Sequence, residues 1–230
     1  MLLYIIRHGT PDYEKDALKE LGIKQAEALG RRLEQSGIDR VFSSPNGRAR
    51  KTGEPLCRRT GLEMTVEPWL SEDLNEVFQG KHTWCFDEIS CETVRSEEVL
   101  GYGDEWYKAP VYGLGEGSEA RWKEIMRCSD AFTEKLGYRR EGRVYRVLRN
   151  NPERVAVFCH CATGRLWSSY LLGMHPGLYW SSFAFYTTGV TVLDFGAQKE
   201  GTLTAPVCLC CDDLSHLYEA SLQDESMVVL

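Results

Sequence analysis

Two short apolar runs, each with a histidine within two residues of its end, constrain the fold of this chain most strongly. Residues 2–6 precede Arg7 and His8, and residues 155–159 precede His160. Uninterrupted apolar runs of this length are typical of strands buried on both faces of a parallel sheet. The carboxyl ends of such strands meet at the edge of the sheet where open α/β folds place their ligand sites. We therefore expect His8 and His160 to contribute to one site.

Helical patterns alternate with these runs. We predict helices over residues 16–36, 47–59, 118–136, 141–150 and 163–172. We predict further strands over residues 41–42 and 64–66, with a closing antiparallel pair at 189–195 and 202–211. Strands that alternate with helices predict an α/β fold, a three-layer α/β/α sandwich with a mostly parallel central sheet. The 230 residues are expected to form a single domain, residues 1–230.

Residues 81–120 interrupt this alternation and are predicted to form a lid or insertion. A structureless stretch of this length is uncommon inside a compact domain. The segment carries nine acidic residues against three basic ones and is rich in aromatic residues. These aromatic side chains either favour an apolar or flat ligand or form a small core of the insertion itself.

The overall charge and the N-terminus exclude several classes of function. A formal net charge of −7 argues against a nucleic-acid-coating surface. No apolar run reaches the roughly 18 residues that span a bilayer, and no basic region precedes the first apolar run as in a signal peptide. We therefore expect a cytoplasmic protein with neither nucleic acid nor membrane as partner, whose cysteines are reduced. Its oligomeric state is not indicated.

A third strand end, Ser43-Ser44-Pro45, opens the predicted helix that contains Arg48. Arg48 falls in the first turn of this helix, where the helix dipole favours an anion. The alternative is a solvated surface arginine.

Taken together, the motifs resemble those of the histidine phosphatase superfamily, also called the phosphoglycerate-mutase-like family. They occur in family order with similar gaps. The motifs are Arg7-His8-Gly9, Leu18-Lys-Glu-Leu-Gly-Ile-Lys-Gln-Ala26, Ser43-Ser-Pro-Asn-Gly-Arg-Ala49 with Thr52, Leu74-Asn-Glu-Val-Phe-Gln-Gly80, and Val155-Ala-Val-Phe-Cys-His160.

The resemblance implies a role for each of five side chains. His8 is the nucleophile that forms a phosphohistidine, and Arg7, Arg48 and His160 hold the phosphate oxygens. Glu76 is the general acid that protonates the leaving oxygen and then the base that activates water. Phosphoryl transfer needs positioning and positive charge around the phosphoryl oxygens, and arginine forks supply both. No metal or other cofactor is then required, and the expected ligand is a small phosphomonoester.

The identity of the acid is open between two glutamates. Glu72 and Glu76 both fit a Leu-x-Glu pattern, and the glycine four residues after Glu76, Gly80, favours Glu76. We interpret Glu72 as a surface acid, because glutamates are mostly exposed.

The chain departs from the family pattern at two places. Pro11 and Glu14 replace the threonine and asparagine that many relatives carry after the Arg-His-Gly motif, and we expect Thr10 to substitute as a phosphate ligand. Cys161 replaces the usual glycine after His160. A thiol beside a cationic pocket tends towards a lowered pKa, which predicts sensitivity to alkylation; the alternative is an inert, packed cysteine.

The family contains phosphatases and mutases, and we favour a phosphatase. The net charge of −6 over residues 81–120 disfavours a diphosphorylated carboxylate, which a mutase must retain. The alternatives are phosphoglycerate-mutase-type transfer and a catalytically silent phosphate-binding module on the same fold.

Overall fold

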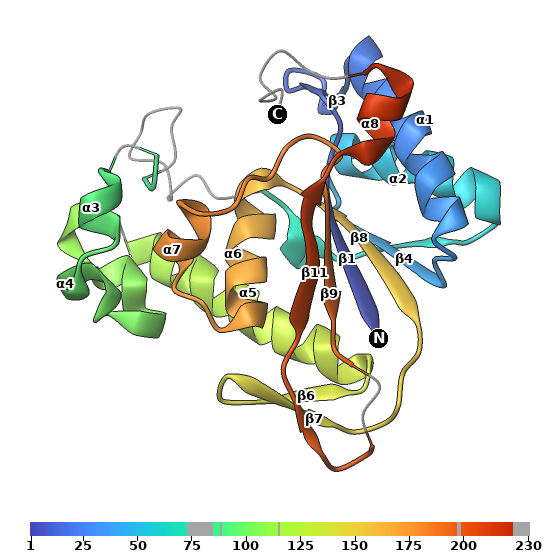
Figure 1. The fold of residues 1–230 in the computed structure, drawn as a ribbon. Coiled ribbons are helices and arrows are strands. Elements are labelled where there is room, and N and C mark those ends of the chain that lie inside the picture. Colours follow the sequence, from blue (N-terminus) through green and yellow to red (C-terminus); the bar gives the residue numbers. More distant parts are fainter. Residues whose placement is uncertain (73–84, 88, 115, 197–198, 223–230) are drawn as a thin grey trace.

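The computed structural model describes residues 1–72, 85–87, 89–114, 116–196 and 199–222. Its centre is a six-stranded sheet in the order β11-β9-β1-β8-β4-β5 (Figure 1). The strands are β1 (Leu2–Arg7), β4 (Arg40–Ser43), β5 (Met64–Val66), β8 (Arg154–Cys159), β9 (Val190–Asp194) and β11 (Val207–Asp213). The first four run parallel, and β9 and β11 close one edge antiparallel. The predicted mostly parallel sheet is confirmed.

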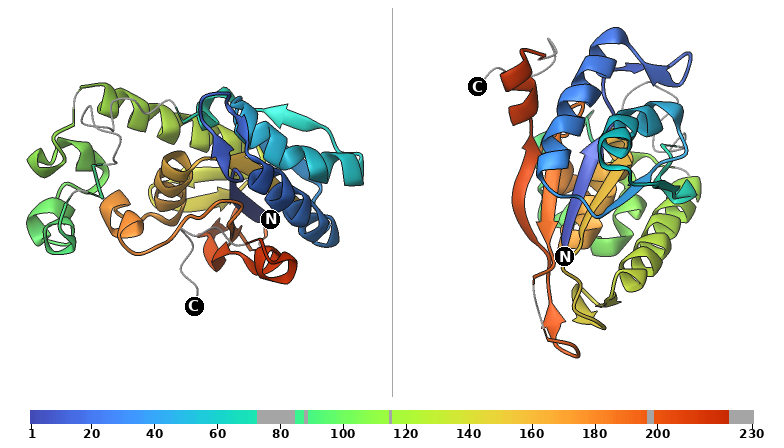
Figure 2. Two further views of the ribbon diagram at one scale, coloured as in Figure 1. Left: turned by 90° about the horizontal axis from the view of Figure 1, so that it is seen from above. Right: turned by 90° about the vertical axis from the view of Figure 1, so that its right-hand side faces the viewer.

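Helices cover both faces of this sheet (Figures 1 and 2). One layer holds α1 (Glu20–Gln35) and α2 (Gly47–Thr60), with α8 (Ser215–Ala220) against α1. The other holds α5 (Glu116–Lys135), α6 (Cys161–Leu172) and α7 (Pro176–Trp180). Side chains alternate along β1, so that Tyr4 and Ile6 join the core under α1 and α2, whereas Leu3 and Ile5 join the core under α5 and α6. This burial on both faces explains the continuous apolar run and confirms the three-layer sandwich.

A small hairpin replaces the first turn of the helix predicted over residues 16–36. The hairpin strands are β2 (Pro11–Asp12) and β3 (Ala17–Leu18), and α1 begins only at Glu20. Asp16 adopts a left-handed backbone with a φ of 45°, which turns the chain away from a helix at this point. The hairpin lies directly after His8 and so forms part of the surroundings of the site.

The helix predicted over residues 141–150 is wrong. The chain instead forms the hairpin β6 (Tyr138–Glu141) and β7 (Val144–Val147), to which β10 (Leu203–Thr204) adds a third strand. Tyr145 and Val147 are buried while their neighbours are half-buried, which is the two-residue period of a strand. Gly142 supplies the turn with a φ of 64°.

The described part of the predicted insertion consists of short helices around an aromatic cluster. These are α3 (Cys91–Val94), α4 (Glu97–Leu100), η2 (Gly103–Lys108) and η3 (Pro110–Tyr112). The ring of Phe86 lies about 5 Å from those of Trp106, Tyr112 and Trp180, and all four side chains are buried. These aromatic residues therefore form a small core, and they do not support a flat or apolar ligand. No helix among the described residues combines the length and apolar character of a bilayer span.

Candidate active site

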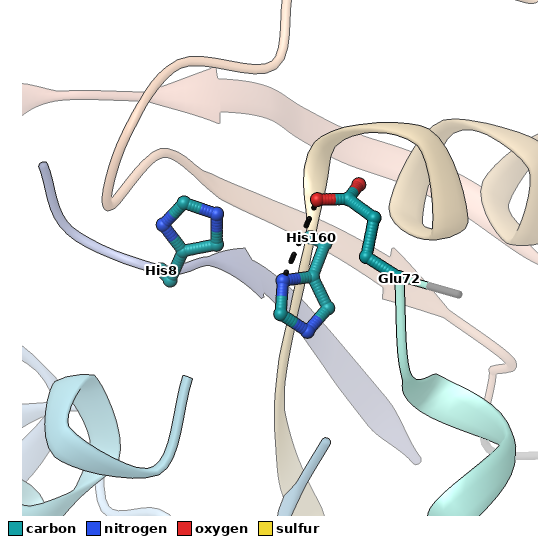
Figure 3. Close-up of side chains that lie close together, drawn as sticks. All are labelled: His8, Glu72 and His160. Atoms are coloured by element: carbon teal, nitrogen blue, oxygen red, sulfur yellow. Dashed lines mark ion pairs between the residues drawn. The ribbon is translucent and has the colours of Figure 1, made fainter. Parts of the chain in front are cut away.

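The two strand-end histidines lie side by side. β1 and β8 are paired in parallel with Arg7 opposite Cys159, so His8 and His160 leave the sheet at the same edge. Their ring centroids are 5.2 Å apart, and both side chains are fully buried. Figure 3 shows them together with Glu72, whose carboxylate is turned towards the ring of His160. The site is thus built at the carboxyl ends of the parallel strands.

The contacts of His8 leave one ring nitrogen available for chemistry. Its Nδ1 lies 2.8 Å from the Gly9 carbonyl oxygen, which can only accept, so Nδ1 carries the proton. Nε2 then has a lone pair, and it is buried without a hydrogen-bond partner among the described residues. Burial, reinforced by the charge of Arg7, lowers the pKa of His8 to about 3. His8 is therefore a neutral imidazole with a free Nε2, the state that a nucleophile requires.

The ring of His160 is fixed through Ser44. Its Nε2 lies 2.7 Å from Ser44 Oγ, and this hydroxyl donates to Asn46 Oδ1 at 2.9 Å. The Ser44 hydroxyl therefore accepts from His160 Nε2–H, and Nδ1 faces Glu72 Oε2 at 3.6 Å. Burial, together with the nearby His8, lowers the pKa of His160 well below its ordinary value. A protonated His160 therefore needs an anion beside it to be stable.

Arg48 points into the site and is not a surface residue. It follows the N-terminus of α2 and is 8% exposed. Its Nη1 donates to Asp16 Oδ1 at 2.6 Å, and its Nη2 lies 3.5 Å from Glu72 Oε2. Asp16 also accepts from the Gly47 backbone N–H at 2.6 Å, so the β2–β3 hairpin holds both the helix start and the guanidinium.

Arg7 and Tyr13 border the site on the side of the hairpin. Arg7 is half-buried, and its Nη1 donates to the Phe185 carbonyl oxygen at 2.6 Å. Tyr13 is 65% exposed, with its ring 6.4 Å from that of His8 and 5.5 Å from the Arg48 guanidinium carbon. The tyrosine, which sequence reasoning missed, therefore lies beside the site.

Thr10 is anchored to helix α1. Its backbone N–H and its hydroxyl both donate to Gln25 Oε1 at 2.9 Å. This contact places Thr10 two residues beyond His8 but directs its hydroxyl to the helix. Its role as a phosphate ligand stays a prediction.

Our interpretation of Glu72 as a surface acid is wrong. Its side chain is 11% exposed, and Oε1 accepts from the Ala162 backbone N–H at 2.9 Å, at the start of α6. Burial raises the pKa of Glu72, an effect that the charges of Arg7 and Arg48 oppose. Glu76, which we favoured, lies outside the described residues. The signal that marks Glu72 is the pair Trp69-Leu70 in η1 (Pro68–Leu70), which is buried and anchors the chain just before it.

The expected lowering of the Cys161 pKa is also wrong. The thiol lies 3.9 Å from the Phe185 carbonyl oxygen. Burial raises the pKa of this thiol, and the charge of Arg7 offsets the effect only in part. The inert, packed cysteine agrees better with this environment than a reactive thiolate does.

The donor atoms of His8, Glu72 and His160 are close enough to hold a cation, because they all lie within 4.8 Å of one another. Two histidines and a carboxylate are a common metal-ligand set. However, the charges of Arg7 and Arg48 act on both His8 and Glu72. Guanidinium groups at this range repel a cation and attract an anion, so the site as a whole fits a tetrahedral oxyanion better.

The fold and this arrangement agree with the comparison to known families. Residues 3–205 match the model of the histidine phosphatase superfamily (branch 1). The chain belongs to this superfamily, as the motifs predicted.

The relatives that the chain resembles include both phosphatases and mutases. A putative phosphoserine phosphatase 2 of Hydrogenobacter thermophilus is 31% identical over 36% of this chain and 45% of its own length. A probable phosphoglycerate mutase of Serratia proteamaculans is 24% identical over 58% of this chain and 60% of its own. The chain therefore matches about half the length of these curated relatives.

Solved structures of the same fold match the chain over most of its length. Phosphoserine phosphatase from Entamoeba histolytica, in complex with 3-phosphoglyceric acid, has a TM-score of 0.62 and 20% identity, with 94% of this chain and 98% of that chain covered. A putative alpha-ribazole-5'-P phosphatase from Escherichia coli has a TM-score of 0.58 and 23% identity, with 90% and 95% covered. At these identities the likeness supports the fold.

Proposed function

We propose that the protein is a phosphomonoester hydrolase that works through a phosphohistidine on His8. The observation that carries this proposal is the buried, unprotonated Nε2 of His8, which lies close enough to Arg7 and Arg48 for their charges to act on it. A neutral imidazole nitrogen is a good nucleophile, and two guanidinium groups neutralise the oxygens of the phosphoryl group that it attacks. The comparisons support the class, since phosphatases are among the relatives and among the structural neighbours.

In the first step, His8 Nε2 forms a bond to phosphorus while the bond from phosphorus to the leaving oxygen breaks. The electron pair goes to the leaving oxygen, which takes a proton from Glu72. Burial raises the pKa of Glu72 and so favours the protonated form that this role needs. We therefore assign the acid role to Glu72 and keep Glu76 as the alternative.

In the second step, water attacks the phosphohistidine. The Glu72 carboxylate takes a proton from this water, the bond between Nε2 and phosphorus breaks, and its electron pair returns to His8. Inorganic phosphate leaves, and the acid is again protonated. His160 Nδ1 lies 3.6 Å from Glu72 Oε2, so a proton on this nitrogen would face the carboxylate of the acid.

The charge of the insertion favours hydrolysis over mutase chemistry. Residues 81–120 have a net charge of −6, which opposes retention of a diphosphorylated acid. Because the relatives include a probable phosphoglycerate mutase, phosphoryl transfer between phosphoglycerates is the second candidate function.

A generic aryl phosphate, assayed in the presence of a chelator, tests the proposal. We expect phosphate release from the wild type, loss of at least ~10³-fold in His8→Ala, and an acid-labile phosphoryl group on His8 in a rapidly quenched reaction. Arg31→Ala, an exposed residue of α1, is the matched control. No release across a panel of phosphomonoesters would favour the silent module, and exchange between phosphoglycerates without net release would favour the mutase.

A further inference from the structure

A single peptide group connects Arg7 to a carboxylate on the edge strand of the sheet. Arg7 Nη1 donates to the Phe185 carbonyl oxygen at 2.6 Å. The Tyr186 N–H belongs to the same peptide group, and it donates to both carboxylate oxygens of Asp212, at 2.8 Å to Oδ1 and 3.0 Å to Oδ2. The Phe185–Tyr186 peptide therefore lies between the carboxylate of Asp212 and the guanidinium of Arg7.

The contact with Asp212 fixes which way this peptide group faces. The N–H and the carbonyl of a trans peptide point in opposite directions, so an N–H that faces Asp212 turns the oxygen towards Arg7. A charged acceptor makes the hydrogen bond stronger, and hydrogen bonds that share one peptide group polarise each other. If the peptide turned over, its N–H would face the guanidinium, and Arg7 would lose this acceptor.

The fold makes room for the Asp212 carboxylate at this position. The register of β11 against β9 shifts between Cys210 and Asp213, and Asp212 within this irregularity has a left-handed backbone with a φ of 52°. Bulges of this kind re-aim side chains next to active sites. The Asp212 N–H donates to Thr191 Oγ1 at 3.1 Å, which anchors the irregularity to β9. A Cβ at Gly189 would overlap Asp212 Oδ1, so glycine leaves the space that the carboxylate occupies.

The charge of Asp212 depends on the groups around it. Burial raises the pKa of Asp212 to about 6, although the hydrogen bond from Tyr186 and the charges of Arg7 in β1 and Arg165 in α6 oppose the shift; Asp213 beside it adds to the rise. The carboxyl is therefore ionised at neutral pH and becomes protonated as the pH falls through 6. A neutral carboxyl accepts the Tyr186 N–H less strongly, which weakens its hold on the peptide.

The orientation of Arg7 matters because this residue belongs to the candidate active site. It directly precedes His8, and its charge acts on both His8 and Glu72. An arginine side chain loses rotamer freedom when a ligand fixes it in one geometry. Contacts that hold the guanidinium before the ligand arrives reduce this cost and so tighten binding.

We propose that Asp212 is a positioning residue for the phosphate site, which holds Arg7, through the Phe185–Tyr186 peptide, in the orientation that binds a phosphoryl group. This inference rests on the proposed function, because Arg7 is a phosphate ligand only in that proposal. Asp212 itself does not touch the phosphoryl group.

Binding of inorganic phosphate to the full chain tests the inference without reliance on turnover. Asp212→Asn replaces the carboxylate by a neutral group of nearly the same shape. At about pH 7.5 we expect its Kd for phosphate, measured by calorimetry, to be roughly 5–20-fold above that of the wild type. At about pH 5 the wild-type carboxyl is protonated too, so the two Kd values should agree within about twofold. The ionisation of phosphate is common to both proteins and cancels in the ratio.

Three further variants separate positioning of Arg7 from a general loss of structure. Asp213→Asn is the matched control, since this neighbouring carboxylate pairs with Arg32 at 2.7 Å and should leave phosphate binding unchanged. Gly189→Ala keeps Asp212 but displaces its carboxylate, so it should weaken binding as Asp212→Asn does, and it carries the test if that variant does not fold. Arg7→Met should bind phosphate more weakly, and the addition of Asp212→Asn to it should have no further effect, because the effect acts through Arg7.

A Kd of Asp212→Asn within about twofold of the wild type at about pH 7.5 would overturn the inference. A loss that is equally large in the Arg7→Met background, or that persists unchanged at about pH 5, would overturn it as well, and so would a wild type that binds no phosphate. If the wild type binds phosphate but hydrolyses no phosphomonoester, the proposed function fails, and the Kd ratios alone decide the inference. If it hydrolyses phosphomonoesters and the Kd ratios stay at one, the inference fails and the proposed function remains.

Discussion

The assignment of Glu72 as the acid can be tested with a nearly isosteric change, Glu72→Gln. The new amide keeps an oxygen that accepts from Ala162 N–H, a contact of 2.9 Å in the wild type. It cannot deliver a proton to the leaving oxygen. The amide loses the attraction between Oε2 and Arg48, which are 3.5 Å apart, and this costs about 1 kcal/mol of stability, too little to unfold a domain of ordinary stability.

The expected loss depends on the leaving group. An alkoxide is a poor leaving group that needs the proton, so kcat/KM for glycerol 1-phosphate should fall by ~10²–10⁴-fold, which corresponds to roughly 3–5 kcal/mol of activation free energy. A nitrophenolate departs without a proton, so p-nitrophenyl phosphate should lose far less. Measurement of both substrates with the same enzyme preparation separates loss of the acid from loss of the fold.

Glu76→Gln is the matched control, since the same change is made four residues further along the chain. If this variant carries the selective loss on the alkyl phosphate and Glu72→Gln does not, the acid role of Glu72 is refuted. An equal loss on both substrates in Glu72→Gln would also refute it, because a group that only positions the phosphate acts on both.

Two other changes probe the groups that surround the histidines. Ser44→Ala removes the acceptor of His160 Nε2–H, a 2.7 Å contact, so we expect a loss of about 1–3 kcal/mol in urea unfolding and a lower kcat; unchanged stability and kcat would contradict the hydrogen bond between Ser44 and His160. Burial lowers the pKa of His216 from 6.5 to about 4, so the unfolded chain binds the proton more readily, and stability should fall by up to ~3 kcal/mol as the pH falls from 6.5 to 4. His216→Gln should remove this part of the pH dependence, and curves that remain parallel over that interval would contradict the buried, neutral state.

Local patterns predicted most of the framework. The runs at residues 2–6 and 155–159 became β1 and β8, because burial on both faces leaves no polar position in such a strand. The helix predicted over residues 47–59 became α2, which ends at the left-handed Gly61. The helix predicted over residues 141–150 was wrong, because a hydrophobic pattern of only a few residues does not separate a helix from a strand. Residues 144–147 became a strand because β6 and the distant β10 supply its partners.

The candidate site was likewise predicted in part from the sequence and decided in part by the tertiary structure. Sequence alone determined which residue types stand at the strand ends, and the superfamily to which the chain belongs follows from their order. Only the tertiary structure decided that Glu72 joins the site, since its partner Ala162 lies 90 positions away along the chain. It also decided the directions in which the pKa values of His8 and Glu72 shift, since a pKa depends on burial and on the charges that folding brings near. The motifs identify the candidate functional side chains, and tertiary packing determines which of them lie together and how their pKa values shift.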